Sequence, residues 1–487
     1  MSHSITIVAM IAYVENNWWC GIDYRKMESA IGLSVSRMRT LFVNHTGKSL
    51  ARYVLSRVLS RRISHAAFSL IHERKRIIDV AMECGFSNPD SFTRAFRRVT
   101  GVNPSAFVSQ HYTVGRMPLY AGVYGVSENP DQKGMDTMNN KPMNGSTVLY
   151  NVPKVEYGTY GITPFPVCLK AVANYLGDDI DYAAIISQCG AAFRLNWDVN
   201  RWFLGNVDVC FTFDQFETIY KKGVEALGRK YARLEKHETT QKQEFIDFII
   251  NEIDSGRPCI ATGIIGPPEA CIITGYRDNG HTLLGWNFFQ HSEAFGSKNT
   301  SFDDSGYFIC TDWWENESTE SVMSVGEISG AKISEKEVVS VAIEVLIGRR
   351  KDQFAKGILA YDAWNTAICN DRDFFDNLIC MSERMLCQGD AMACLADGRG
   401  NASAFFMQLY SGNVGQPLYK EVAKNFDSIV CHINEMASVL GGWGRDEEQL
   451  RVFARPEIRK EISRLILACK EADENALANL KKLYELL

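Results

Sequence analysis

The thiol of Cys168 is placed where a cysteine could act as a nucleophile. It stands in PFPVCLKAVANYLG, residues 164–177, a pattern that predicts a helix opened by Pro166. The partial positive charge of a helix N-terminus lowers the pKa of a thiol in the first turn. The same position also suits a small buried apolar residue. Cys168 is therefore either a nucleophile for hydrolysis or acyl transfer, or a structural residue.

A cysteine nucleophile needs a base within hydrogen-bond reach, and the sequence does not place one. His237 and His291 stand in polar segments, His281 in a turn, and His432 in a helical pattern far along the chain. We therefore predict no catalytic residue and no enzyme. If the region is an enzyme after all, a hydrolase or an acyltransferase, Cys168 is its nucleophile.

Ligand binding is the other chemistry that this part of the chain could perform. Glu269 follows two prolines and is either an exposed loop acid or a carboxylate that faces a bound molecule. GAAFRLNWDVNRWFLG, residues 190–205, mixes aromatic and charged residues without periodicity, and we expect a loop that lines a pocket. An apolar or aromatic small molecule suits such a site. The predicted ligand-binding residues are Phe165, Cys168, Phe193, Arg194, Trp197, Trp202, Glu269, Tyr276 and Trp286.

Two short segments near the N-terminus carry side chains that can read DNA. They are SRMRT, residues 36–40, and SFTRAFRR, residues 91–98. Arginine pairs with guanine, and small hydroxyls serve phosphates or bases. Residues 1–110 hold 15 Lys and Arg against 7 Asp and Glu, whereas the rest of the chain holds 37 against 51. A solvated helix face is the alternative, but two such faces on a basic segment favour a polyanion partner.

The elements that position these side chains form two repeats in residues 1–110. Ser34 or Ser36 is the expected N-cap of the third helix, and Gly47 is its stop. The order helix, turn, helix, glycine occurs twice, joined by one long helix. The predicted helices cover residues 5–16, 23–33, 34–47, 49–71, 76–86 and 88–101.

Beyond residue 110 the pattern changes twice. Residues 111–147 include a short stretch with strand character and then a polar segment, and we interpret them as a linker. Helices are predicted at 164–177 and 244–256, and strands at 258–266, 270–278, 281–289 and 306–314. Helices followed by an antiparallel meander indicate an α+β domain, and from Ser334 the strands stop and a helical pattern continues to the end.

Composition excludes several classes of protein. The chain has 487 residues, and two or three domains are expected at that length. The 14 cysteines are scattered without a CxxC pair, so we expect reduced thiols, no metal site and no cofactor. No apolar run reaches the roughly 18 residues of a membrane helix, and the N-terminus lacks the features of a signal peptide. We therefore expect a cytoplasmic protein that does not bind membranes.

The stretch IIDVAMECGFSNPDSFTRAFRRVTGVNPSAF, residues 77–107, closely resembles the signature of AraC/XylS-type transcription regulators. The resemblance implies an all-α double helix-turn-helix head whose two recognition helices enter adjacent segments of the major groove. Asn103 and Pro89 depart from the usual pattern, and Pro89 weakens base reading at its position. The resemblance implies DNA contacts at Ser36, Arg37, Arg39, Thr40, Asp90, Ser91, Thr93, Arg94 and Arg98. It implies that Phe42, Phe86, Phe92 and Phe96 are core residues.

Residues 148–487 resemble papain-like, bacteriocin-peptidase-type folds and BtrH-like proteins. The resemblance is carried by the Cys168 helix with its YLG and DY, by RPCIATGIIG, and by the paired GYRDNGHTLLG. In such peptidases a histidine begins the strand that here reads EACIITGY. Glu269, Ala270 and Cys271 occupy that slot, and Asn287 has no histidine to orient. The resemblance therefore implies a papain-like pseudoenzyme.

Together these patterns predict a multidomain transcription regulator that binds double-stranded operator or promoter DNA. We predict an AraC-type head in residues 1–110, a linker in 111–147, a papain-like α+β effector domain in 148–333 and a helical region in 334–487 that packs on it. A small-molecule effector would gate DNA binding or activation. RNA polymerase is a further possible partner, and the helical region could make a homodimer. The alternative is a DNA-tethered cysteine hydrolase or acyltransferase.

Overall fold

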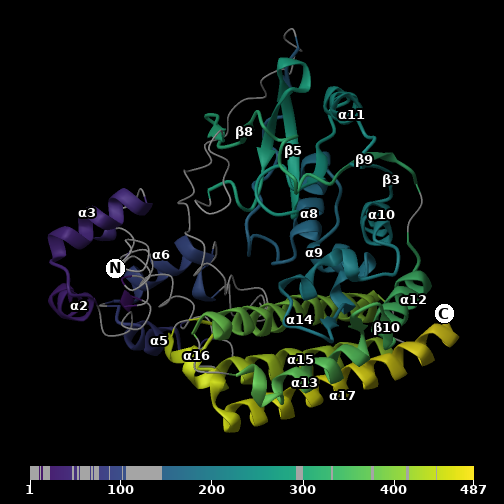
Figure 1. Ribbon diagram of the computed structural model, residues 1–487. Helices are drawn as coiled ribbons and strands as arrows, with labels where there is room; N and C mark the ends of the chain where they lie inside the picture. Colours follow the sequence, from purple (N-terminus) through teal and green to yellow (C-terminus); the bar gives the residue numbers. More distant parts are fainter. Residues whose placement is uncertain are drawn as a thin grey trace. The chain divides into compact units, whose positions relative to one another are not determined.

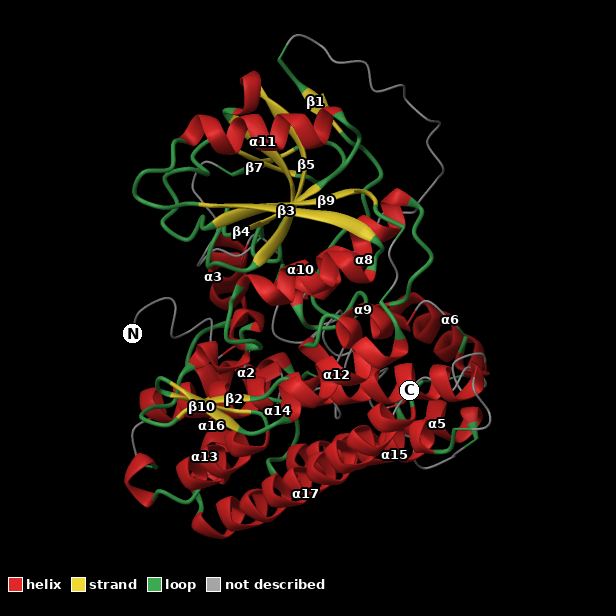
Figure 2. Cartoon of the chain, turned by 90° about the vertical axis from the view of Figure 1, so that its right-hand side faces the viewer, coloured by secondary structure: helices red, strands yellow, loops and turns green. Residues whose placement is uncertain are grey.

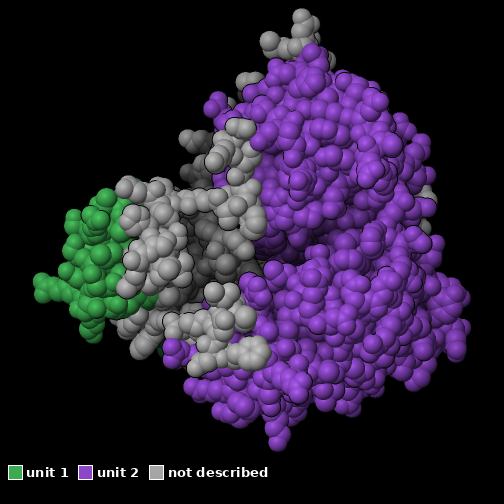
Figure 3. Space-filling view, in the orientation of Figure 1, with its two compact units in different colours: residues 1–133 green, residues 134–487 purple. Residues whose placement is uncertain are grey.

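The structure is a computed structural model with two compact units, residues 1–133 and 134–487 (Figures 1 and 3). It describes residues 10, 13–14, 22–46, 49–51, 54, 66, 70, 76–86, 88–100, 103–105, 145–291, 300–330, 333–374, 378–412, 416–445 and 447–487. Among these residues, no helix has the length and apolar character required to cross a bilayer. The predicted division into four segments is finer than these two units and stays a prediction.

The first unit contains short helices with local caps. They are α2 (Tyr24–Ile31), α3 (Val35–Thr46), α5 (Ile77–Glu83) and α6 (Pro89–Thr100). The Asp23 carboxylate accepts from the backbone N–H groups of Arg25 and Lys26, and Gly32 ends α2 with a φ of 74°. The Ser34 hydroxyl accepts from the Arg37 N–H at 3.4 Å, so Ser34 caps α3. Each cap satisfies N–H groups that the first turn leaves without a partner.

Two small cores hold these helices. One contains Met27, Met38 and Phe42, and the other contains Val80, Phe92 and Phe96. Phe86 is half-buried against the second core and meets Phe92 edge to face at 5.3 Å. Most of the predicted helices at 5–16 and 49–71, and also Gly47 and the linker up to residue 144, lie outside the described residues.

The second unit is built on an antiparallel sheet with the order β3-β9-β4-β5-β6-β8-β7, and β1 pairs with β5. The strands are β1 (Thr147–Val148), β3 (Arg229–Glu235), β4 (Cys259–Thr262), β5 (Ala270–Arg277), β6 (Thr282–Trp286), β7 (Ser301–Phe302), β8 (Phe308–Cys310) and β9 (Ser321–Ile328). The four predicted strands correspond to β4, β5, β6 and β8. Strands β3 and β9, which pair at one side of the sheet, and the two-residue strands β1 and β7 were not predicted.

Helices cover both faces of this sheet. Figure 2 shows α11 (Lys242–Asp254) on one face and α8 (Pro164–Leu176) and α10 (Glu217–Ala226) on the other. The helix predicted at residues 164–177 is confirmed as α8. It begins at Pro164 rather than Pro166, with Thr163 as its N-cap residue. Cys168 therefore lies in the second turn, one turn later than expected.

The C-terminal half of this unit is helical, as predicted. Its helices are α12 (Glu335–Leu346), α13 (Ile358–Ile368), α14 (Leu378–Gly412), α15 (Leu418–Val439), α16 (Glu447–Ala454) and α17 (Pro456–Leu486). The expectation that strands stop at Ser334 is wrong at one place. β10 (Arg349–Lys351) and β11 (Phe354–Lys356) form a hairpin that pairs with β2 (Asn196–Asp198).

That small sheet also corrects the expected loop at residues 190–205. The segment holds two short 3₁₀ helices, η2 (Ala191–Phe193) and η3 (Leu204–Val207), and the fully buried strand β2. Trp197 on β2 lies between Trp364, stacked at 5.6 Å, and Trp202, edge to face at 5.4 Å. The irregular aromatic spacing therefore arises from a short strand that packs on helices, a contact that local periodicity does not reveal.

A buried ion pair joins the helical half to η2. Arg399 on α14 and Asp473 on α17 have fully buried side chains and lie 2.6 Å apart. Arg399 also donates to the Ala192 carbonyl, and the Tyr361 hydroxyl donates to Asp473 at 2.7 Å. One continuous core includes residues of both halves, so the sheet and the helices form a single unit.

Candidate functional site

Helix α3, the first helix predicted to read DNA, presents all of its predicted contact residues to solvent. Ser36, Arg37, Arg39 and Thr40 are exposed, whereas Met38 between them is fully buried. The Arg39 guanidinium lies 5.5 Å from the centre of the Tyr24 ring on α2. This arrangement gives α3 a polar outer face held by an apolar inner one, as a helix that enters a groove requires.

Helix α6, the second helix predicted to read DNA, exposes fewer of its predicted contact residues to solvent. Asp90 and Arg94 are exposed, and Ser91 and Thr93 are half-buried. The Ser91 hydroxyl donates to the Asn88 carbonyl at 2.8 Å, and the Ser91 N–H donates to the Asn88 side chain at 2.7 Å. The helix begins at Pro89, which needs no N–H partner. Arg98 belongs to α6, but its side chain lies outside the described residues.

In the second unit, Cys168 is completely buried on α8, within electrostatic range of a second thiol, that of Cys271. Burial raises the pKa of Cys168 well above its usual value, and the nearby Cys271 and Glu269 raise it further. Among the described residues, no histidine is one of the groups that act on this thiol. The pKa of Cys271 is raised to about 12 by burial. Two neutral thiols stand where a papain-like site needs a thiolate and an imidazole.

Asn287 does not orient a base either. Its amide donates to the carbonyls of Gly263 and Ile265, both at 3.1 Å, and its oxygen accepts from the Phe289 N–H. The nearby Asn287 amide also lowers the pKa of the Cys271 thiol, against the larger effect of burial. The side chain therefore fixes the loop after β4, and nothing in this geometry activates Cys168.

Carboxylates gather beside this thiol pair, at the junction of the two halves of the unit. Strand pairing places two of them, because Thr262 at the end of β4 pairs with Ala270 on one side and Ser321 on the other. Glu269 and Glu320 directly precede these partners, so they flank the end of β4. Two more come from the segment after η3 and from α14. We call Asp208, Glu269, Glu320 and Asp390 the carboxylate cluster.

Within the cluster, the charge of one carboxylate raises the pKa of another. Burial, and next the charge of Asp208, raise the pKa of Glu269 to about 7, against the opposing effect of Arg194. Burial likewise raises the pKa of Asp208 to about 6, with Glu320 and Asp390 adding to it. Glu269 reaches solvent in part, but the surrounding protein removes much of its hydration.

Positive charge compensates this cluster unevenly. Arg445 pairs with Asp390 at 2.6 Å. The Arg194 guanidinium donates instead to the carbonyls of Val207 and Ala191 and to the Thr163 hydroxyl. Within the described part of the chain, neither Asp208 nor Glu269 has an ion pair within 4 Å. Within these residues, Asp208 and Glu269 thus lack a cation at ion-pair distance, and Arg194 opposes the rise of their pKa values only in part.

The structure brings together four of the nine predicted ligand residues. Glu269 raises the pKa of Cys168, and Arg194 lowers that of Glu269. Phe165 packs edge to face at 4.9 Å on Tyr220, whose pKa Glu269 also raises. The others lie elsewhere. Phe193 packs on Phe406 and Phe426, Trp197 and Trp202 pack on each other, Trp286 packs on Tyr307, and Tyr276 donates to Asp254.

Asp208, Glu320 and Asp390 were not among the predicted site residues. One signal was available for Asp390, because it stands in QGDAMACLADGRG, where polar residues interrupt an otherwise small and apolar helix. Buried polar groups on such a helix must meet partners from other elements. Asp208 and Glu320 carry no comparable signal, since each stands beside a turn where an exposed acid is common.

Comparison with known families assigns each unit separately. Residues 27–110 match a helix-turn-helix domain, and residues 165–326 match a peptidase C39-like family. The chain therefore joins an AraC-type helix-turn-helix domain to a papain-like domain and a helical region. This confirms the predicted fold class and the resemblance of each part.

Individual relatives match about a fifth of the chain. The probable transcriptional regulator LumQ of Photobacterium leiognathi is 32% identical over 103 residues, 21% of this chain and 40% of LumQ. The virulence regulon transcriptional activator VirF of Yersinia enterocolitica is 31% identical over 93 residues, 19% and 33% of the two chains. The transposon Tn10 TetD protein of Escherichia coli is 28% identical over 105 residues, 22% and 73%. The chain thus spans about a third to two fifths of the length of LumQ and VirF.

Proposed function

We propose that this protein is a DNA-binding transcription regulator whose second unit binds a small-molecule effector. Effector binding would favour one arrangement of the chain and so change the population that is competent to bind DNA or to activate transcription. The partner of the first unit is double-stranded operator or promoter DNA. RNA polymerase contact, a homodimer and a cytoplasmic location remain parts of this proposal.

The outer face of α3 supports the DNA-binding part. Its hydroxyls and guanidinium groups are exposed on one side, above a core that holds the helix. The basic excess of residues 1–110 adds attraction for phosphates that does not depend on sequence. Relatives of this unit are described as transcriptional regulators, which agrees with the proposal.

Glu269 and Asp208, which have no ion pair within the described residues, support the effector part of the proposal. The sequence favoured an apolar or aromatic effector, but Phe193 and Trp197 pack inside the protein and Trp202 is held by Asp373. The groups left for recognition are carboxylates. A cationic group on the effector would neutralise them and lower the cost of keeping them charged at the junction. We therefore infer a cationic, amine-bearing effector rather than a purely apolar one.

The low nucleophilicity expected for the Cys168 thiol agrees with a binding role. A buried thiol with a raised pKa, beside a second thiol and a carboxylate, is a poor nucleophile. The alternative, a DNA-tethered cysteine hydrolase or acyltransferase, needs rapid reaction of Cys168 in the folded protein. A thiol-reactive substrate probe followed by peptide mass spectrometry tests this. Rapid labelling of Cys168 that is lost in Glu269→Gln would favour the enzyme.

The central experiment measures DNA affinity and thermal stability of the full chain. DNA sites are first selected from a random duplex library, and organic mono- and polyamines are then added alongside neutral analogues of equal size. A rise in melting temperature with an amine, accompanied by a change in DNA affinity, supports the proposal. The Glu269→Gln variant should lose the response, and the exposed Glu327→Gln should retain it. If no amine alters either quantity, the effector part is wrong.

A further inference from the structure

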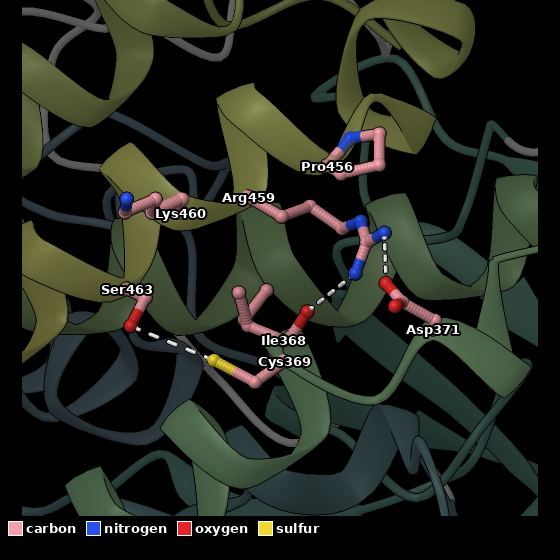
Figure 4. A pocket seen from close by; sticks show the side chains of 7 residues that line it. All are labelled: Ile368, Cys369, Asp371, Pro456, Arg459, Lys460 and Ser463. Atoms are coloured by element: carbon pink, nitrogen blue, oxygen red, sulfur yellow. Dashed lines mark hydrogen bonds and ion pairs between the residues drawn. The ribbon is translucent and has the colours of Figure 1, made fainter.

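A second site, unrelated to the carboxylate cluster, lies where α13 ends and α17 begins. A cavity of about 170 Å³ is lined there by Ile368, Cys369, Asp371, Pro456, Arg459, Lys460 and Ser463 (Figure 4). We call it the α13–α17 pocket. It combines an exposed thiol with two basic side chains, and no step of the proposed function uses it.

The thiol of the pocket is accessible. Of the free cysteines in the described part of the chain, Cys369 and Cys431 are exposed and Cys210 is partly so, whereas the others are buried. Cys369 directly follows α13, and its sulfur lies 3.6 Å from the Ser463 hydroxyl. Figure 4 shows the sulfur directed at this hydroxyl, among the residues that line the pocket. A reagent in the cavity would therefore meet the sulfur directly.

Arg459 gives the pocket an unused hydrogen-bond donor. The residue is only 4% exposed, and its Nε has no partner among the described residues. Its other nitrogens donate to the Ile368 carbonyl at 3.0 Å and to Asp371 at 2.6 Å. A buried guanidinium N–H without an acceptor is costly, so an entering acceptor gains a charge-assisted bond.

The counter-ion of Arg459 is exchangeable. The Asp371 side chain is 81% exposed, and a carboxylate so exposed contributes little to an ion pair. Lys460 is exposed as well, and no ion pair involves it within the described residues. An anion in the pocket could therefore replace Asp371 at Arg459 and also attract Lys460.

Cys431 provides an internal contrast. It is exposed on α15, one turn after Asp427, and burial and the Asp427 charge raise its pKa. Cys431 thus lies near one carboxylate, with no cation among the described groups that shift its pKa, whereas Cys369 shares its pocket with two cations and one exposed carboxylate. Charge on an incoming reagent should discriminate between them.

We propose that the α13–α17 pocket binds small anions and directs anionic low-molecular-weight disulfides to Cys369. In the reaction, the Cys369 thiol releases its proton to solvent and the thiolate attacks one sulfur of the disulfide. The original S–S bond breaks, a mixed disulfide forms at Cys369, and the other half leaves as a thiolate. Glutathione disulfide, which carries several carboxylates, has the required chemistry.

The test compares the two exposed thiols within one protein. The full chain is treated with glutathione disulfide or with the cationic disulfide cystamine, and the rates at Cys369 and Cys431 are followed by peptide mass spectrometry. The ratio of the Cys369 rate to the Cys431 rate should be about tenfold higher with the anionic reagent. Sulfate should compete with glutathione disulfide at Cys369 only.

Two variants link this selectivity to the pocket. Lys460→Gln should lower the ratio severalfold, whereas Lys424→Gln, at an exposed lysine paired with Glu421, should not. Arg459→Gln removes the buried donor, and its melting curve is recorded so that loss of selectivity is separated from loss of folding. Equal ratios for the two disulfides, or a Lys460→Gln protein that behaves as the unsubstituted chain, would overturn the proposal.

Discussion

The two units of this chain hold their polar side chains in different ways. In the first unit, the side chains expected to read DNA lie on the outer face of a helix, within a few residues of one another and of the cap that starts the helix. In the second unit, the carboxylate cluster is assembled from segments far apart in the chain and lies at a junction inside the fold.

This difference teaches where each unit is vulnerable. Exposed arginines cost the first unit nothing, because water solvates them until DNA replaces it. In the second unit, carboxylates that have lost hydration lower the free energy of unfolding unless a cation binds beside them. The first unit should therefore respond to mutation mainly in DNA affinity, and the second mainly in stability and its dependence on pH.

We expect the largest effect from Asp473→Ala, which should lower the stability of the second unit and leave that of the first unchanged. Asp473→Ala leaves the buried Arg399 without its counter-charge, and such a loss costs about 3–5 kcal/mol. Thermal unfolding of the full chain should show the transition of residues 134–487 shifted strongly and that of the first unit unchanged. Asp362→Ala, which removes an exposed partner of Lys470, is the control and should cost at most about 1 kcal/mol. Comparable losses in both variants would contradict the prediction.

The next effect belongs to the first unit. Arg39→Ala and Arg94→Ala should each cost about 1–3 kcal/mol of DNA binding and relax the preference at one base pair. Binding to selected DNA sites and to their single-base variants measures both changes. Arg25→Ala, at an exposed arginine on α2, is the control and should keep the sequence preference. If both variants retain wild-type affinity and preference, the placement of α3 and α6 on DNA is wrong.

The third prediction concerns the pH dependence of the stability of the second unit. Because the pKa of Glu269 is raised to about 7 in the folded protein, the folded state binds this proton more tightly than the unfolded state does. The unfolding free energy of the second unit should therefore fall as the pH rises from about 4.5 to 7. Glu269→Gln should remove much of this slope and stabilise the unit by about 1–2 kcal/mol at pH 8.

Melting curves between pH 5 and 8 measure this slope. Glu327→Gln serves as the control, since the Glu327 pKa is lowered by Lys230 and its titration lies below this range. The slope should persist in that variant. A Glu269→Gln protein with the slope of the unsubstituted chain would show that the cluster is already compensated.

The smallest effect concerns a cap in the first unit. Asn88→Ala removes the oxygen that accepts from the Ser91 N–H, and loss of such a cap costs about 1 kcal/mol. The transition of the first unit should shift down slightly, with no change in the second. Ser29→Ala, which removes an exposed hydroxyl within α2, should shift it by less than about 0.5 kcal/mol. An effect of Asn88→Ala on the second transition would mean that the units do not unfold independently.

Most of the local secondary structure and the family that each domain resembles could be predicted from the amino-acid sequence. The Ser34 cap, the periodicity of α8 and the strands β4, β5, β6 and β8 depend on a few neighbouring residues, so they could be predicted from the sequence. The Asp23 and Asn88 caps are equally local but were not predicted. The AraC-type signature likewise sits within one stretch of residues 77–107. The helices at 5–16 and 49–71 were predicted in the same way but lie mostly outside the described residues.

Only the tertiary structure decided which side chains meet. Trp197 was expected to line a pocket, yet a small sheet places it between Trp364 and Trp202. Asp208 carried no sign that it would approach Glu269. Burial and the interaction of charges depend on contacts between elements far apart in the chain, and local spacing does not encode them.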